Sequence, residues 1–129
     1  SKEYKIFTSA IVGGCLPIEL GTALSIKMRK GEEKVWLFCG DMTAETGGFI
    51  ECWKYAHFFN LPITFIIEDN GLSTDTPTQK VWGKDYSFWR DKKYENIIYY
   101  EYKRTYPHYG VGKFVDFNDN NKLKEDKGI

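Results

Sequence analysis

The stretch that decides the fold is residues 40–70, which read GDMTAETGGFIECWKYAHFFNLPITFIIEDN. An apolar run at 35–39, VWLFC, precedes it, and a second apolar run at 63–67, ITFII, lies near its end. Short continuous runs of strand-forming residues are typical of strands that are buried on both faces of a parallel sheet. The sequence therefore predicts two neighbouring parallel strands.

The segment between the two runs has the pattern of a single helix. Its apolar residues recur at helical spacing, at Phe49, Cys52, Trp53, Ala56 and Phe59. Thr43 and Thr46 precede this pattern and are candidate N-caps. Strand, loop, helix and strand within about 33 residues predict a βαβ unit, with the right-handed crossover that nearly all such units have.

The flanking sequence extends this unit into an α/β domain. Before it come a polar lead-in, a turn at IVGG and a helix that begins near Pro17, with Leu20, Ala23, Leu24 and Met28 on its apolar face. After Asn70 the predicted elements are a loop at 71–83, a short helix at 86–95, a strand at 96–104, a short edge strand at 113–117 and a solvated tail at 118–129. We expect a mainly parallel sheet with helices on both faces, formed by residues 1–117 as one domain.

Composition narrows the functional class. The chain has 129 residues, of which 42% are hydrophobic, and this suits one globular domain. It has 18 basic and 18 acidic residues, so we expect neither nucleic acid nor a membrane surface as a partner. Cys15, Cys39 and Cys52 are odd in number and lack metal-binding spacing, which predicts buried reduced thiols and a cytoplasmic protein.

Polar residues end both strands of the predicted unit. Asp41 follows the first apolar run and Asn70 follows the second. Ligands of an open parallel sheet bind outside the carboxyl ends of its strands, so both side chains are expected at one edge. Carboxylate and amide oxygens suit Mg²⁺ or Ca²⁺, and the helix N-terminus after Asp41 suits a phosphate. These features predict a Mg²⁺ and diphosphate site. The structural alternatives are an N-cap for Asp41 and a turn residue for Asn70.

The spacing of these residues resembles the cofactor signature of thiamine diphosphate-dependent enzymes. That signature is a Gly-Asp-Gly, an intervening helix and an Asn-Asn pair. The resemblance runs without a gap from Ile11 to Asn70 and includes IVGG at 11–14, Pro17, Gly21, Gly40, Asp41, Gly47, Glu51, Ala56, Leu61, Pro62 and Asn70. It is closest to the alpha subunit of 2-oxoacid dehydrogenases of the pyruvate and branched-chain type, and transketolases come second.

The resemblance implies a set of site residues. Asp41, Asn70 and the backbone carbonyl of Leu72 would be the protein ligands of Mg²⁺. The diphosphate would lie along Gly40, Met42 and Thr43, and the aminopyrimidine ring would lie near the backbone of Ile11 and Val12. The implied reaction is the cleavage of a C–C bond next to a carbonyl, in a 2-oxo acid or a ketose phosphate.

Two positions depart from the signature. Met42 replaces its last glycine, so either the backbone there takes a negative φ or the chain approaches the diphosphate less closely. Asp69 replaces the first asparagine of the closing pair, where it either caps the strand end or adds negative charge near the site.

Three further polar residues have open interpretations. His108 lies in a loop after a late strand, where the resemblance implies an active-site histidine, but a surface histidine explains it equally well. His57 lies within the central helix and is interpreted as a packing or interface residue. Glu51 matches an acid of the family on the same helix, and we interpret it as a member of a structural ion pair.

In the family, the glutamate that contacts the cofactor ring comes from a second, pyrimidine-binding domain. No part of this sequence resembles that domain, so we expect a truncated or minimal half of an enzyme that needs a beta-type partner subunit, in an α₂β₂-like oligomer. Two alternatives remain open. One is a non-catalytic binding or assembly module that keeps the fold. The other is a different phosphate-binding domain, such as a flavodoxin-like one.

Overall fold

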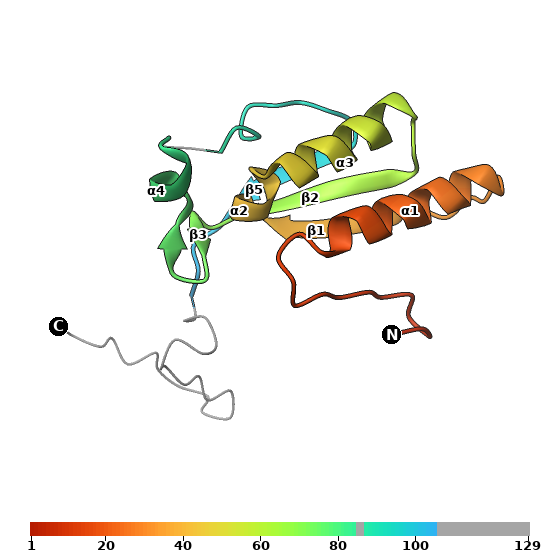
Figure 1. Ribbon diagram of the computed structural model, residues 1–129, viewed down its shortest axis with the longest axis horizontal. Coiled ribbons are helices and arrows are strands. Elements are labelled where there is room, and N and C mark those ends of the chain that lie inside the picture. Colours follow the sequence, from red (N-terminus) through yellow and green to blue (C-terminus); the bar gives the residue numbers. More distant parts are fainter. Residues whose placement is uncertain (85–86, 106–129) are drawn as a thin grey trace.

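The computed structural model describes residues 1–84 and 87–105, in which a parallel sheet carries helices α1 and α3 (Figure 1). The helices are α1 (Cys15–Met28), α2 (Asp41–Ala44), α3 (Gly47–Phe58) and α4 (Thr78–Trp82). The strands are β1 (Val35–Gly40), β2 (Ile63–Asp69), β3 (Leu72–Ser73), β4 (Thr76–Pro77) and β5 (Ile97–Glu101). The edge strand and tail predicted at 113–117 and 118–129 lie outside the described residues.

The predicted pair of parallel strands is confirmed. Strands β1 and β2 pair in parallel with helix α3 between them in the chain, and β5 pairs in parallel with the other side of β2. The register places Gly40 opposite Glu68, so the residues that follow β1 and those that end β2 lie at the same edge of the sheet. This edge is where the sequence predicts the site.

The bounds of α3 follow from its N-cap. The Thr46 hydroxyl accepts a hydrogen bond from the Phe49 N–H at 3.3 Å and donates one to the Thr43 carbonyl at 2.7 Å. Thr46 is therefore the N-cap. The other candidate, Thr43, is not a cap, because it belongs to the four-residue helix α2, in a segment that the sequence predicts to be loop.

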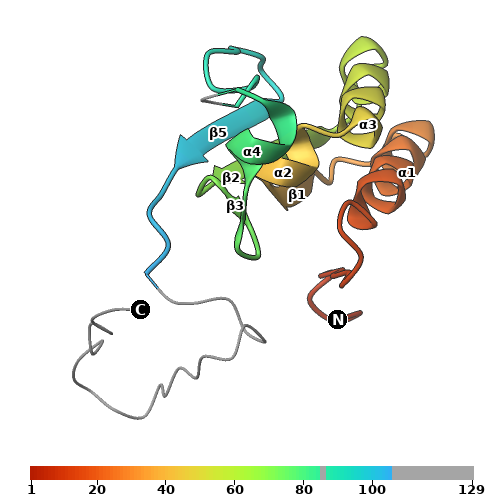
Figure 2. The ribbon, with the colours of Figure 1, turned by 60° about the vertical axis from the view of Figure 1, so that its left-hand side comes forward.

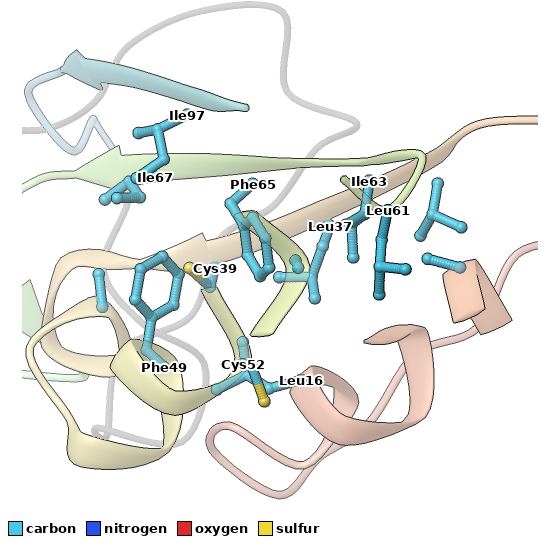
Figure 3. Close-up of a cluster of buried hydrophobic side chains, with 14 of the residues drawn as sticks. Leu16, Leu37, Cys39, Phe49, Cys52, Leu61, Ile63, Phe65, Ile67 and Ile97 are labelled. Carbon is cyan, nitrogen blue, oxygen red and sulfur yellow. The ribbon is translucent and has the colours of Figure 1, made fainter. Parts of the chain in front are cut away.

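The core lies between one face of the sheet and the two long helices. Figure 3 shows Phe49 of α3 among sheet residues that include Cys39 and Phe65, and the Phe49 and Phe65 rings meet edge to face with centroids 5.3 Å apart. Helix α1 contributes Leu16, Ala23 and Ile26 to the same cluster. Met28 and Phe59, which the sequence places on apolar faces, are exposed because they lie at the far ends of the two helices.

The other face of the sheet has no helix over it in the described part of the chain. Alternate residues of β1 are buried and exposed, and Trp36 and Phe38 are each 56% exposed. On β5, Ile98 and Tyr100 are also exposed on this face. The prediction that β1 is buried on both faces is therefore wrong, and helices on both faces are not found among these residues.

The segment after β2 also differs from its prediction. In place of a plain loop, β3 and β4 form a short antiparallel hairpin that leads into α4. Figure 2 shows α2, α4 and this hairpin together at one end of the sheet. Residues 87–96 form turns, where the sequence predicts a short helix, because Trp89 is anchored by its ring nitrogen to the Ala44 carbonyl at 2.7 Å. The strand predicted at 96–104 is confirmed as β5, which is shorter and spans Ile97–Glu101.

No helix in the described ranges is long and apolar enough to span a membrane. Cys15, Cys39 and Cys52 are free thiols; Cys39 and Cys52 are buried as predicted, whereas Cys15, at the start of α1, is only half-buried. Burial raises the pKa of Cys39 to about 12, with smaller contributions from Cys15, Glu68 and Asp41.

Candidate functional site

A cavity of about 250 Å³ lies at the carboxyl edge of the sheet. Its walls come from Asp41, from the end of β2 and the turn after it, from α4, from the side chains Lys84, Ser87 and Arg90, and from the end of β5. Asp41 and Asn70, the two side chains predicted to meet at this edge, both line it. The strand register explains the meeting, because β1 and β2 end side by side.

Asp41 is the first residue after β1, and its side chain points inward, being only 1% exposed. The Thr78 hydroxyl donates a hydrogen bond to Oδ2 of this carboxylate. Oδ1 has no hydrogen-bond partner within the described ranges. Burial raises the pKa of the Asp41 carboxyl and the charge of Asp69 adds to that rise, whereas the Thr78 hydroxyl and, more weakly, the nearby backbone N–H groups of Asp41 and Asn70 oppose it. A buried carboxylate with one unpartnered oxygen is costly unless a donor or a cation reaches it.

Both polar atoms of the Asn70 side-chain amide form hydrogen bonds. Its Nδ2 donates to the Tyr102 hydroxyl at 3.0 Å, and its Oδ1 accepts from the Leu72 N–H, also at 3.0 Å. The second bond is the side-chain turn that the structural alternative predicts. Gly71, the residue between, has φ +71°, a conformation that favours glycine. Asn70 is thus both a turn residue and a wall of the cavity.

Asp69 does what both of its interpretations predict. Its Oδ1 accepts from the Gly71 N–H at 2.8 Å, and its Oδ2 accepts from the Tyr99 hydroxyl, so the carboxylate closes the strand end. Its negative charge also reaches Asp41, where it raises the pKa. Both oxygens of Asp69 are occupied, in contrast to those of Asp41.

Met42 lies in α2 and has a negative φ, as the first alternative for this departure predicts. Gly40, Met42, Thr43 and Leu72 do not line the cavity, although Gly40 and Met42 adjoin Asp41, and Leu72 adjoins Gly71.

The turn before α1 lies beside Thr43. A Cβ placed on Gly13 would be 3.8 Å from Thr43 Cγ2. Ile11 and Val12 in this turn are 75% and 70% exposed, so they stand on the surface near α2 and outside the cavity.

Two ion pairs contribute side chains to the wall of the cavity. Glu45 accepts from Lys84 at 2.5 Å and from the Ser87 hydroxyl at 2.7 Å, and these bonds hold Lys84 and Ser87 against α2. Arg90 pairs with Glu101 of β5 at 2.9 Å. Sequence reasoning missed these residues and also Thr78 and Tyr102, because no spacing rule links their side chains to Asp41 or Asn70, although Glu45 lies four residues after Asp41 and Thr78 eight residues after Asn70.

His108 lies outside the described residues. His57 is a packing residue, as one interpretation predicts, because its ring stacks on Trp53 with centroids 5.4 Å apart and meets the Tyr94 ring.

Glu51 is exposed on α3 and forms no ion pair within 1–84 and 87–105, so the ion-pair interpretation is wrong. A surface position lets water solvate its carboxylate without a basic partner.

The donor set of the cavity fits a hard divalent cation. Asp41 supplies a carboxylate oxygen that has no partner in the described ranges, and Asn70 supplies a side-chain amide oxygen that accepts a hydrogen bond from the Leu72 N–H. Within the part of the chain that the structure describes, no group of three or more His, Cys, Asp or Glu side chains is placed to hold a metal. This set therefore suits an ion that keeps phosphate and water ligands, as Mg²⁺ does, rather than an ion held by a full protein cage.

The chain forms an open parallel sheet with a cavity at the carboxyl ends of its strands. This arrangement places it in the class of open α/β domains that bind ligands at that edge of the sheet. Residues 1–99 match the family described as Dehydrogenase E1 component, and the chain belongs to this family. The match confirms the predicted resemblance to the alpha subunits of 2-oxoacid dehydrogenases.

Curated relatives share this assignment. The chain is 41% identical over 69 residues to the alpha subunit of acetoin:2,6-dichlorophenolindophenol oxidoreductase from Cupriavidus necator, covering 53% of this chain and 20% of the relative. It is 32% identical over 101 residues to pyruvate dehydrogenase E1 component subunit alpha-3 of Arabidopsis thaliana, covering 68% and 24%. For the pyruvate dehydrogenase E1 alpha subunit of Zymomonas mobilis the identity is 33% over 81 residues, covering 62% and 23%. The matched region thus spans about a quarter of these relatives or less.

Proposed function

We propose that this chain is the Mg²⁺- and diphosphate-binding part of a thiamine diphosphate-dependent 2-oxoacid dehydrogenase, of the alpha-subunit type. One observation carries the proposal: Asp41 is buried at the carboxyl edge of the sheet, beside Asn70, with one carboxylate oxygen that has no hydrogen-bond partner in the described ranges. Membership of the Dehydrogenase E1 component family supports the choice of cofactor.

The protein groups of the site have distinct roles in this proposal. Asp41 Oδ1, the Asn70 side-chain oxygen and the Leu72 carbonyl would bind Mg²⁺. The backbone of Gly40, Met42 and Thr43 would line the diphosphate. Met42 and Thr43 are the second and third residues of α2, in the first turn, where the N–H groups lack acceptors within the helix.

The exposed backbone of Ile11 and Val12 would approach the aminopyrimidine ring. Bound thiamine diphosphate would supply the nucleophile and the electron sink for cleavage of a C–C bond next to a carbonyl. His108, in the segment after β5, remains the candidate active-site histidine.

A partner chain completes the proposal. We expect a beta-type, pyrimidine-binding subunit to supply the contact to the cofactor ring, in a hetero-oligomer that acts as an oxidoreductase on a 2-oxo acid. The names of the relatives, which are alpha subunits, support this kind of partner. A ketose phosphate, the substrate class of transketolases, is the second candidate, because the site residues alone do not separate the two.

Calorimetric titration tests the site. Thiamine diphosphate is titrated into the chain with and without Mg²⁺, beside Asp41→Asn and the control Asp91→Asn, which makes the same carboxylate-to-amide change at an exposed residue. We expect binding that needs Mg²⁺ in the wild type and the control and is lost in Asp41→Asn. If the chain alone does not bind, the titration is repeated with the pyrimidine-binding chain of the same organism. Mg²⁺-independent binding, or no binding with the partner either, contradicts the proposal.

The second candidate function is a binding or assembly module of the same fold without turnover. The position of Asp69 favours it, because this carboxylate adds negative charge beside Asp41 where the family signature has an amide. The test is 2-oxo acid turnover by the chain mixed with its partner. Cofactor binding without turnover supports the module, and turnover that needs both chains supports the enzyme. Turnover by the chain alone contradicts the requirement for a partner.

A further inference from the structure

Thr78 links Asp41, which follows β1, to the turn that follows β2. It is the first residue of α4 and is only 7% exposed. Its hydroxyl donates to Asp41 Oδ2, and its backbone N–H donates to the Gly71 carbonyl at 3.0 Å. A threonine hydroxyl has one proton to donate, and the bond to Asp41 uses it. Thr78 is therefore held both to the turn after Asn70 and to the carboxylate that ends β1.

The bond to Thr78 decides which oxygen of Asp41 is free. The last torsion of an aspartate side chain is broad and nearly two-fold, so without a donor the two oxygens are close to equivalent. With Oδ2 held by Thr78, Oδ1 is the oxygen that keeps no partner in the described residues. Asp69, on the neighbouring strand, shows the contrasting arrangement, because donors occupy both of its oxygens.

We propose that Thr78 is a positioning residue, whose hydroxyl fixes the Asp41 carboxylate so that Oδ1 is presented to a divalent cation at this edge of the sheet. This inference rests on the proposed function, since it concerns the same cation. It adds a role for α4 and for the β3–β4 hairpin, which hold Thr78 in place. Outer partners of metal ligands orient those ligands, and their loss typically weakens metal affinity by about 10- to 100-fold.

Three threonine variants test the role of the hydroxyl. Thr78→Val keeps the shape of the side chain without the hydroxyl, and Thr78→Ser keeps the hydroxyl. The matched control is Thr76→Val, the same change at an exposed residue of β4. The readout is the affinity for Mg²⁺ in the presence of saturating thiamine diphosphate, measured by calorimetry on the full chain together with its pyrimidine-binding partner. Asp41→Asn is measured in parallel.

We expect Thr78→Val to weaken Mg²⁺ binding by about 10- to 100-fold, and Thr78→Ser and Thr76→Val to bind like the wild type. A purely structural role would lower the thermal unfolding temperature of Thr78→Val and leave its Mg²⁺ affinity unchanged, and that result overturns the inference. Circular dichroism checks that each variant is folded. If Thr78→Val does not fold, Thr78→Ala at low temperature gives the comparison, and wild-type affinity there also overturns the inference. If neither variant folds without the cation, folding is measured as Mg²⁺ is added. Folding at the Mg²⁺ concentration that saturates the wild type overturns the inference, and folding only at higher concentrations supports it.

The measurements on the wild type and on Asp41→Asn distinguish failure of this inference from failure of the proposed function. Absence of Mg²⁺-dependent binding in the wild type, or equal binding by Asp41→Asn, contradicts the proposed function itself and with it any role of Thr78 toward the cation. Wild-type binding that Asp41→Asn abolishes and Thr78→Val leaves intact contradicts only the role of Thr78.

Discussion

Replacing Asp41 with asparagine should stabilise the protein when no divalent cation is present. The wild-type carboxylate is 1% exposed, and its Oδ1 has no partner among the described residues. A buried acceptor left without a hydrogen bond costs about 1–3 kcal/mol, and a charged one costs more. Asparagine keeps an acceptor for the Thr78 hydroxyl. Its NH2 group, which takes the place of Oδ1, is also buried without a partner among these residues but carries no charge, so the gain is the difference between burying a charged group and burying a neutral one. We therefore expect the free energy of unfolding at pH 7 to rise by about 1–2 kcal/mol.

This stabilisation should depend on pH in a defined direction. Burial raises the pKa of Asp41 above its ordinary value of 3.8. Between that value and the raised one, the folded state holds more protons than the unfolded state, so this group makes the wild type less stable as the pH rises. Below the window both states are neutral at Asp41 and the cost is absent. The unfolding free energies of the wild type and Asp41→Asn should therefore approach each other toward pH 4 and separate toward pH 7.

Addition of Mg²⁺ with thiamine diphosphate should reverse the order of the two proteins. A ligand present at 100 times its Kd adds about 2.7 kcal/mol to the stability of the protein that binds it. The wild type gains this amount and Asp41→Asn does not. The assay is urea unfolding followed by tryptophan fluorescence from about pH 3.5 to 8, so that it covers the window that begins at the ordinary pKa, with Asp91→Asn as the control. An Asp41→Asn variant that is less stable than the wild type at pH 7 without metal would refute the reasoning, as would a difference that does not change with pH.

Three further changes test the packing around the site. Thr46→Ala removes the N-cap of α3 and should lower the free energy of unfolding by about 1 kcal/mol in urea titrations; an unchanged midpoint would count against the cap. Trp89→Phe leaves the buried Ala44 carbonyl without its donor and should cost about 1–3 kcal/mol in the same assay, whereas no loss would mean that another group replaces the donor. Cys39, with a pKa of about 12, should resist alkylation at pH 8 while the half-buried Cys15 reacts, as followed by mass spectrometry, and equal rates would contradict the burial of Cys39.

The βαβ unit and the position of the site were predictable from the sequence because both depend on local pattern. Two apolar runs and a helical spacing between them predict β1, α3 and β2, and the pairing of these strands is confirmed. A residue that follows a parallel strand lies at the carboxyl edge of the sheet, so Asp41 and Asn70 were predictable neighbours. The resemblance to 2-oxoacid dehydrogenase alpha subunits depends on the same stretch, and the family match confirms it.

The partners of Asp41 were not predictable, because they depend on contacts distant in the chain. Thr78 lies 37 residues from Asp41, in a polar segment that reads as loop, and no spacing rule links the two residues. The turns at 87–96 have a similar cause. Their segment has the composition of a short helix, but the bonds of Glu45 to Ser87 and of Trp89 to Ala44 hold it in another conformation. Tertiary contacts override local propensity in such short segments.

The exposed face of the sheet was mispredicted for a different reason. A continuous apolar run such as VWLFC does not distinguish a strand covered on both faces from one whose second face is apolar but open. Trp36 and Phe38 have the composition of core residues, yet no element in the described residues covers them. Which face is covered depends on the arrangement of the helices, and periodicity within one strand does not specify it.

The central claim is that Asp41 and Asn70 form a cation site for a diphosphate. Its most direct test is a crystal structure of the chain, with its partner if that is required for binding, grown with thiamine diphosphate and Mn²⁺ in place of Mg²⁺. The account predicts one anomalous difference peak at the carboxyl edge of the sheet, at coordination distance from Asp41 Oδ1 and the Asn70 side-chain oxygen, with the diphosphate against it. Bound cofactor with no metal peak there, or with the metal held by other residues, would contradict it.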